Sequence, residues 1–519
     1  MERWSNPVFL VQLRARTHVS VRFGLTGSLW SRAPSKRAAV WLGSASGLIA
    51  AWQKAADERH RTAPPRRSVH GADCGNGRIQ TRYNSHLMVD FSSFIRRRRQ
   101  LLAELDGGAL VAFAAAPTVR NNDVTHEFRQ DSDFFYLTGF DEPEAALVLV
   151  GGEAPRSVLF VRPRDPEREV WDGDRRGVEG AAELGVDEAR SIHELDELLP
   201  RLLLGHARLF ARFEDETLLD ARLAKALRAA RREGRRGATY PTQVIDSAML
   251  VHEMRRKKDA PELALIERAI TITGDAHVEA MARAAPGVYE YEIEAVLRAA
   301  FRANGSERVA YEPIVGSGTN ATVLHYVKNH RQMLDGELLL IDAGCEFGYY
   351  AADITRTFPV NGRFSGPQRE VYEVVLAAQK AAIAAAAPGA TLEHVHEAAT
   401  RCICEGLVAL GAVPGSAGEV EAEGRYKRFF MHKTSHYLGM DVHDVGRYFD
   451  AGRPRPLEPG VVITVEPGLY FARNAEVPER LRGIGVRIED DVLIESGGAR
   501  VLSNNVPKEL DDVEHACRG

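Results

Sequence analysis

The strongest constraint on this chain is a set of acidic residues placed within, or at the end of, strongly apolar runs. The runs are ELLLIDA (337–343), VVITVE (461–466) and VRIEDDVLI (486–494), and their composition predicts buried strands. A buried carboxylate is costly unless it is paired or binds a metal ion. A fold containing these strands must therefore supply counter-charges, either basic side chains or metal ions.

The first two carboxylates, Asp342 and Asp353, stand eleven residues apart on segments expected to be neighbouring strands joined by the glycine-rich turn 344–348. Across such a hairpin they would repel until one kept its proton, and a shared divalent cation removes that conflict. An exposed Asp beside a turn is a common alternative, so this pair alone leaves both interpretations open.

Three histidines, His432, His436 and His443, fall within twelve residues. Lys433 occupies the position that Glu holds in HExxH, which excludes a zinc protease of that type. Taken alone, the group fits either a functional site or a cluster on the surface or at a helix cap.

Two further carboxylates follow. Glu466 closes an apolar strand just before the turn signal Pro467-Gly468, and Glu489 lies in GIGVRIEDD. For Glu489 the alternative is a salt bridge to Arg487, although residues two apart on a strand share a face and could serve both purposes.

In chain order the candidate ligands are Asp342, Asp353, His436, Glu466 and Glu489. With the motifs IDAG, DITRTFPV, SHYLGMDVHD, TVEPGLY and GVRIED, the region from about 250 to 505 resembles the pita-bread metallopeptidase family. The family contains methionine aminopeptidase, prolidase and aminopeptidase P. The resemblance implies an α+β pita-bread catalytic domain with two divalent metal ions, and the oxygen-rich ligand set suits Mn²⁺. Because no ligand position is missing, a metal-free binding module of the same fold is disfavoured.

The resemblance also implies a role for each ligand. Asp342 chelates one ion, Asp353 and Glu489 bridge both, and His436 and Glu466 complete the second. Two ions about 3.5–4 Å apart can hold a bridging hydroxide that attacks the substrate carbonyl. Glu466 is the candidate general base for the proton of that hydroxide.

Further residues match the substrate side of the family's site. His443 is expected to donate to the developing oxyanion, and His325 matches the substrate-side histidine. His432 matches a histidine lining the pocket for the proline after the cleaved bond. Tyr470 and Arg487 are also assigned to substrate binding.

The amino-terminal half reads as an α/β domain. Strands are expected at 109–114, 145–150 and 157–161, with helices at 91–105, 193–204 and 216–232. RNNDVTHEFRQDSDFFYLTGFDEPE (120–144) resembles the amino-terminal domain of aminopeptidase P, which methionine aminopeptidases lack. We expect domains at 88–250 and 251–519. In the second, helices are expected at 263–284 with Pro261 in the first turn, 367–387 and 391–410, and a strand at 353–359.

These resemblances together imply a metalloaminopeptidase that releases the amino-terminal residue from peptides with proline in second position. Prolidase, which cleaves Xaa-Pro dipeptides only, is the alternative. The stretch 169–186 also fits, and its Trp171 is either a core residue or a cap on a neighbouring subunit's site. Family members usually oligomerise, so a homo-oligomer, dimer or tetramer, is expected.

Residues 1–87 differ from the rest, with 14 Lys and Arg against 4 Asp and Glu, although the whole chain has a net charge of −5. They are either a targeting presequence, such as a mitochondrial one, or a leader preceding a true start at Met88, which we favour. The acidic remainder argues against nucleic-acid binding. The lack of an apolar run of about 18 residues argues against a membrane span. Five scattered cysteines without a CxxC pair suit a cytoplasmic enzyme.

Overall fold

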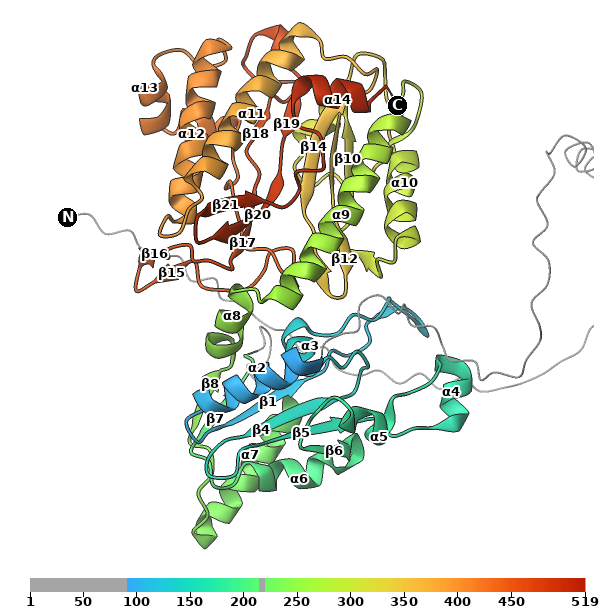
Figure 1. Ribbon diagram of the computed structural model, residues 1–519, viewed down its shortest axis with the longest axis vertical. Coiled ribbons are helices and arrows are strands. Elements are labelled where there is room, and N and C mark those ends of the chain that lie inside the picture. Colours follow the sequence, from blue (N-terminus) through green and yellow to red (C-terminus); the bar gives the residue numbers. More distant parts are fainter. Residues whose placement is uncertain (1–90, 214–219, 519) are drawn as a thin grey trace, which may run out of the picture. The chain divides into compact units, whose positions relative to one another are not determined.

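The computed structural model describes residues 91–213 and 220–518, all within one compact unit, His86–Gly519. The predicted leader 1–87 lies outside the described residues. The described chain forms an α/β half, followed by an α+β half in which several small antiparallel sheets are flanked by long helices (Figure 1). This succession is the fold class that the sequence predicts.

The α/β half is built on a six-stranded sheet with the order β6-β5-β4-β1-β7-β8. Its strands are β1 (Ala109–Phe113), β4 (Ala146–Val150), β5 (Arg156–Val161), β6 (Glu188–Ser191), β7 (Arg208–Ala211) and β8 (Gln243–Asp246). The meander β1-β4-β5 is antiparallel, whereas β6, β7 and β8 pair in parallel with their neighbours. A short hairpin, β2 (Val119–Asn121) and β3 (Val124–Thr125), lies outside this sheet.

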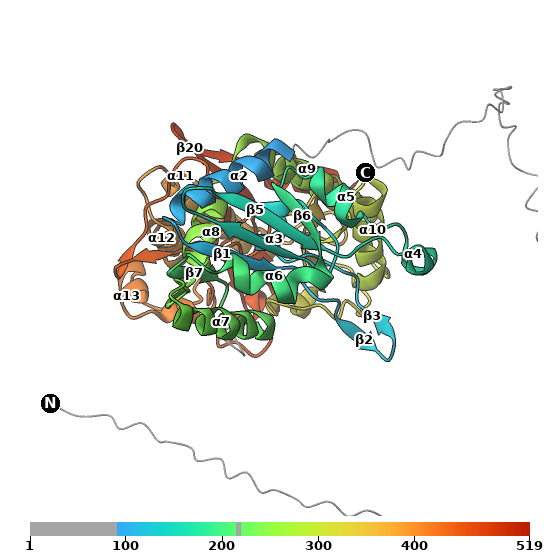
Figure 2. The ribbon, with the colours of Figure 1, turned by 90° about the horizontal axis from the view of Figure 1, so that it is seen from below.

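Both faces of the four inner strands β1, β4, β5 and β7 are mostly buried, which explains their nearly continuous apolar sequences. Leu110 of β1 packs on the side of α2 (Phe91–Glu104) and α3 (Ser132–Thr138), whereas its neighbours Ala109 and Val111 pack on the opposite side. That opposite side is covered by α6 (Leu195–Leu202) and α7 (Ala221–Glu233), from which Figure 2 views the sheet. The short helices α4 (Pro166–Asp172) and α5 (Gly177–Ala182) complete this half.

The α+β half begins after α8 (Ala248–Arg256) with the long helix α9 (Ala260–Arg283). Asp259 caps α9 in a capping box with Glu262, and Pro261 lies in the first turn, as predicted. The other helices are α10 (Glu290–Ala303), α11 (Gly366–Ala385), α12 (Leu392–Ala409), α13 (Ala417–Ala422) and α14 (Leu510–Ala516). Figure 1 shows α9 and α10 beside one group of strands and α11 and α12 beside another.

The strands of this half are β9 (Arg308–Val309), β10 (Ile314–Ser317), β11 (Leu338–Ala343), β12 (Cys345–Phe347), β13 (Tyr350–Ala351), β14 (Ile354–Pro359), β15 (Phe449–Asp450), β16 (Arg453–Pro454), β17 (Val462–Val465), β18 (Gly468–Tyr470), β19 (Gly485–Arg487), β20 (Asp490–Glu495) and β21 (Gly498–Val501). They form the sheets β10-β11-β14, β17-β20-β21, β13-β12-β9, β18-β19 and β15-β16.

Two details correct the sequence-based expectations. The predicted strand 486–494 is two strands, β19 and β20, which pair with different partners and meet at Ile488–Glu489. The connection between Asp342 and Asp353 is also longer than a glycine turn, because it contains the separate hairpin β12–β13. The main-chain carbonyl of Ala352 passes so close to Gly344 that a Cβ there would lie 1.7 Å from its oxygen.

Candidate metal centre

Neighbouring strand ends bring the five predicted ligands to one place. In the β11–β14 pair, Asp342 lies opposite Thr355, so Asp342 and Asp353 reach the same end of the sheet. Glu489 lies at the junction of β19 and β20, where its amide donates to the Thr355 carbonyl at 3.1 Å.

The other two ligands come from β17 and the segment beside it. Glu466 directly follows β17. His436 is carried by an extended segment that pairs with β17, with the Thr464 amide donating to the His436 carbonyl at 3.0 Å. The pairing of this segment with β17 therefore places the side chains of His436 and Glu466 next to each other and near Asp353.

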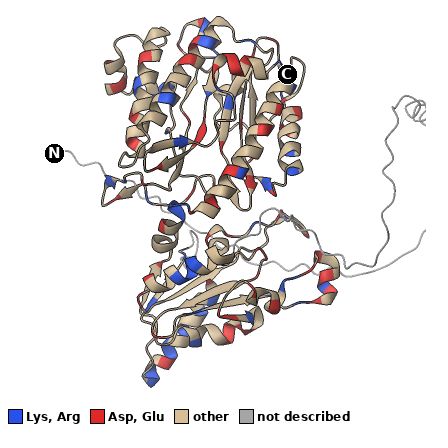
Figure 3. Cartoon of the chain, viewed as in Figure 1, with Lys and Arg blue, Asp and Glu red and all other residues tan. Residues whose placement is uncertain are grey.

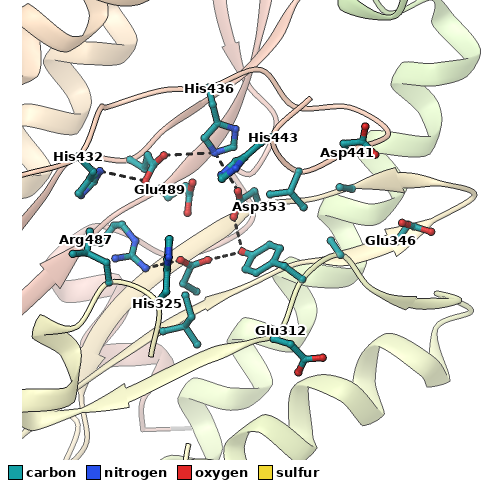
Figure 4. A pocket seen from close by; sticks show the side chains of 18 of the residues that line it. Glu312, His325, Glu346, Asp353, His432, His436, Asp441, His443, Arg487 and Glu489 are labelled. Carbon is teal, nitrogen blue, oxygen red and sulfur yellow. Dashed lines mark hydrogen bonds and ion pairs between the residues drawn. The ribbon is translucent and has the colours of Figure 1, made fainter. Parts of the chain in front are cut away.

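The side chains converge closely. His436 Nε2 lies 3.5 Å from a carboxylate oxygen of Asp353 and 3.6 Å from one of Glu466. One ligand atom from each of Asp353, His436 and Glu489 lies within 4.8 Å of the others. Figure 4 shows these side chains pointing toward a common centre.

Burial and mutual repulsion raise the pKa of three carboxyl groups of the cluster, those of Asp342, Glu466 and Glu489. Burial, with Asp353, Glu466 and Asp342 nearby, raises the pKa of Glu489 well above its usual range. Burial also raises the pKa of Glu466 to about 7, against the opposing effect of His436 and Arg487. Although burial lowers the pKa of His436, the ion pair with Asp353 raises it overall, to about 9. The cluster thus has an excess of negative charge that protons or metal cations must balance.

The donor set fits divalent metal ions. It offers four carboxylates and one imidazole, the ligands that manganese-type ions accept, and no thiolate. Besides His436, Arg487 contacts Asp342 directly, and His432 Nδ1 lies 3.6 Å from a carboxylate oxygen of Glu466. Bound cations would remove the repulsion that raises the pKa of Glu489 and Glu466.

Two residues near the ligands were not predicted from the sequence. The Tyr311 hydroxyl lies between the two Asp side chains and donates to Asp342 Oδ1 and Asp353 Oδ1, each at 2.5 Å. The Thr355 hydroxyl donates to Glu489 Oε2 at 2.7 Å. Thr355 lies in a motif that the sequence singles out, but Tyr311 lies in AYEPIV, where nothing distinguishes it from a core tyrosine.

The alternative prediction, a salt bridge between Arg487 and Glu489, is wrong, because Arg487 pairs with Asp342 instead. The Arg487 guanidinium, which is 3% exposed, instead donates to Asp342 Oδ2 and to the Tyr470 hydroxyl, the latter at 2.9 Å. Strand β19 ends at Arg487, so the regular strand geometry that would place residues 487 and 489 on one face does not continue to Glu489.

Four of the five predicted substrate-side residues line a cleft of about 820 Å³ together with the candidate ligands. His325, His432, His443 and Arg487 all line it (Figure 4). The His443 ring packs edge to face against His436, with ring centroids 4.4 Å apart.

Tyr470 does not line the cleft but contacts His432, which does. Its hydroxyl lies 2.9 Å from His432 Nε2, and the two rings pack 5.6 Å apart.

Trp171 lies elsewhere, on α4, with 84% of its surface exposed. The interpretation of Trp171 as a core residue is therefore wrong, and its role as a cap on a neighbouring subunit stays a prediction.

The fold and the candidate site are those of a metallopeptidase, and sequence comparison identifies the family. Residues 264–496 match metallopeptidase family M24, and residues 94–210 match the aminopeptidase P amino-terminal domain. The chain belongs to metallopeptidase family M24 and combines an aminopeptidase P amino-terminal domain with a pita-bread domain.

Individual relatives agree with this assignment. The chain is 44% identical over 430 residues to Xaa-Pro aminopeptidase of Escherichia coli K12, covering 82% of this chain and 97% of that protein. It is 43% identical over 425 residues to Xaa-Pro aminopeptidase of Haemophilus influenzae, covering 81% and 96%.

Among solved structures, Pseudomonas aeruginosa aminopeptidase PepP matches with a TM-score of 0.81 and 45% identity, over 83% of this chain and 98% of that one. The low-pH form of Escherichia coli aminopeptidase P matches with a TM-score of 0.80 and 43% identity, over 83% and 99%.

Proposed function

We propose that this protein is an Xaa-Pro aminopeptidase, which hydrolyses the bond between an amino-terminal residue and a following proline. The observation that carries the proposal is the convergence of the five candidate ligand side chains with His325, His432 and His443 in one cleft. The 44% identity to an Xaa-Pro aminopeptidase over most of both chains supports the substrate class and does not favour prolidase.

The metal-binding assignment is part of the proposal. Asp342 would hold one ion, Asp353 and Glu489 would serve both, and His436 and Glu466 would complete the second. Mn²⁺ is the ion we propose, because oxygen donors dominate the set. When bound, such ions polarise the scissile carbonyl and lower the pKa of an attacking water.

Two side chains then act on the substrate: Glu466 transfers a proton, and His443 stabilises negative charge. Glu466, whose pKa is raised by burial, accepts a proton from the attacking water and returns it to the proline nitrogen as the C–N bond breaks. His443 donates to the oxyanion that forms at the carbonyl.

We propose that His432 shapes the pocket for the proline ring, with Tyr470 behind it. The His432 ring packs at 5.1 Å against Phe430 as well as against Tyr470. A rigid, mostly apolar wall suits a ring that lacks an N–H and has a fixed φ. His325 and Arg487 would contact the substrate beside the ligands.

The test is hydrolysis of Ala-Pro and Ala-Pro-Ala by the full chain, with Mn²⁺ added after chelator treatment. We expect Mn²⁺-dependent release of Ala from the tripeptide. Cleavage of the dipeptide alone would replace the proposal with prolidase, and cleavage of neither would return the chain to the class of metal-free binding modules.

We also propose domains at 88–250 and 251–519, a homo-oligomer of two or four subunits, and a cytoplasmic location. The end of β8 at Asp246 and the start of α9 at Ala260 support the boundary. The exposed pair Val170 and Trp171 supports a contact between subunits. The first two bacterial relatives give the mitochondrial alternative no support.

Peptides remain the only macromolecular substrate we propose. Basic and acidic side chains are interspersed over the described residues, which does not suit a nucleic-acid surface (Figure 3). Within 91–213 and 220–518, no helix combines the length and apolar character needed to cross a membrane.

A further inference from the structure

The segment 440–444 carries His443 into the cleft but contains no helix or strand. Its position must therefore come from the groups that hold its backbone and its acidic side chains. Most of these groups lie far away in sequence, in α8 and in the amino-terminal half.

Asp441 and Asp444 hold the segment on either side of His443. One nitrogen of Arg255, Nη2, donates to Asp441 Oδ2 and to Asp444 Oδ1, both at 2.7 Å. Lys258 donates to the other oxygen of Asp444 at 2.7 Å. Arg255, Lys258 and Asp444 are each at least 94% buried, so these charge-assisted bonds are shielded from water.

The amino-terminal half supplies the other contacts. Arg129 Nη2 donates to the Met440 carbonyl at 2.8 Å, and the Ser132 hydroxyl donates to Asp441 Oδ1 at 2.6 Å. Asp133 accepts from Arg255 Nη1 at 2.7 Å. These residues belong to RQDSDF, which the sequence marks as an amino-terminal domain motif.

The geometry points to Arg129 and Ser132 as positioning residues of the active site, which act by holding the segment 440–444 so that His443 faces the reacting carbonyl. The amino-terminal half thereby contributes to catalysis in the same subunit. The inference rests on the role proposed for His443.

The experiment is a double-mutant cycle of Ser132→Ala and His443→Ala, assayed on Ala-Pro-Ala with saturating Mn²⁺. Loss of one hydrogen bond to a carboxylate predicts a fall in kcat/KM of roughly tenfold for Ser132→Ala in the native background. In the His443→Ala background we expect no further fall, because Ser132 acts through that side chain. An equal fall in both backgrounds, or no fall in the native one, overturns the inference.

Thr138→Val is the matched control, because it also removes a hydroxyl from a hydrogen bond of α3. Thr138 donates to the Phe134 carbonyl, accepts from the Phe140 amide and is fully buried, but its hydroxyl makes no hydrogen bond to the described residues 440–444. Thr138→Val should lower the thermal midpoint and leave kcat/KM unchanged. An equal loss of kcat/KM in this control would mean that any damage to α3 suffices, and would overturn the role of Ser132.

Hydrogen exchange of the segment, measured by mass spectrometry on chelator-treated protein, gives a readout independent of activity. Ser132→Ala should speed exchange in peptides covering 439–445 and not in those covering β17; unchanged exchange overturns the inference. If the native enzyme cleaves no Xaa-Pro peptide, the proposed function fails. The exchange measurement still tests whether Ser132 holds the segment 440–444 in place. Should Ser132→Ala not fold, Asp441→Ala removes the acceptor of the same hydrogen bond from the other side.

Discussion

Asp353 is the residue on which most of the candidate site depends. It contacts His436, accepts from Tyr311 and lies in the group of ligand atoms shared with Glu489. Asp353→Ala should abolish metal binding and lower kcat/KM by at least about 100-fold. Calorimetric titration with Mn²⁺ and the Ala-Pro-Ala assay measure the two effects.

The control for this substitution is Asp335→Ala. Asp335 is an exposed carboxylate that accepts one hydrogen bond from Asn361. It should leave the stoichiometry of Mn²⁺ and the kinetics unchanged. Normal metal binding by Asp353→Ala would show that Asp353 is not a ligand.

The role we propose for Glu466 differs from that of the other candidate ligands, because its pKa of about 7 suits proton transfer near neutral pH. Glu466→Gln keeps the shape but cannot accept the proton of the attacking water. We expect kcat to fall by about 100-fold or more while KM changes little. Turnover near the native rate would remove Glu466 from catalysis.

At this scale the sequence predicted candidate ligands because a carboxylate at the end of an apolar run must find a counter-charge, and the structure brings these side chains together. It could not identify Tyr311, whose role arises only from its closeness to Asp342 and Asp353. The partner of Arg487 was also beyond the sequence, since strand β19 ends at that residue and its regular geometry does not continue to Glu489.

Among the elements, the connection between β11 and β14 is the least tolerant of change. A Cβ on Gly344 would lie 1.7 Å from the Ala352 carbonyl oxygen, which is main chain and cannot rotate away. Gly344→Ala should therefore destabilise the protein by more than about 3 kcal/mol and reduce metal affinity, because Asp342 lies two residues away.

Chemical denaturation and Mn²⁺ titration measure these effects. Gly418→Ala is the control, since its Cβ would meet nothing within 4 Å inside helix α13. It should be neutral or stabilising by about 0.5–1 kcal/mol. Equal stability of the two variants would contradict the close approach at Gly344.

Helices and strands were predicted well where one periodicity ran through the whole element. Examples are the strand 338–343 and the helix 366–385, both found within two residues of expectation. The break between β19 and β20 was missed, because the apolar run VRIEDDVLI continues through it while the backbone changes its pairing partner from β18 to β17.

For the molecule as a whole, the charged cluster links metal binding to stability and pH. Without metal, the raised pKa of His436, about 9, means that its proton stabilises the fold fully below pH 6.5 and is lost as the pH rises through 9. Glu466, with a pKa raised to about 7, loses its stabilising proton in the same direction. Buried histidines with a lowered pKa, such as His277 and His432, titrate below this window.

The chelator-treated protein should therefore have a lower thermal midpoint at pH 9 than at pH 7, measured by scanning calorimetry. The loss corresponds to about 2 kcal/mol or more, at about 1.4 kcal/mol per pKa unit. With Mn²⁺ in excess, the two midpoints should approach each other, because metal replaces the protons. A metal-free midpoint that is unchanged or higher at pH 9 would contradict this balance.

At this scale the sequence predicted two domains of the right classes but not the contacts between their motifs. Ser132 and Asp441 are 309 positions apart in sequence. A serine and an aspartate are as common in solvent-exposed loops as in buried contacts, so their types alone do not predict this hydrogen bond. Only the fold brings RQDSDF against the segment that carries His443.

The Arg255 guanidinium, which contacts Asp133 as well as both aspartates around His443, limits how this protein can be divided and recombined. A hybrid enzyme that joined residues 251–519 to the amino-terminal domain of another peptidase would keep Arg255 with one of its three carboxylates missing, unless that domain had an aspartate at the position of Asp133. The practical unit of exchange is thus larger than either domain, and a working graft must move RQDSDF, α8 and residues 441–444 together.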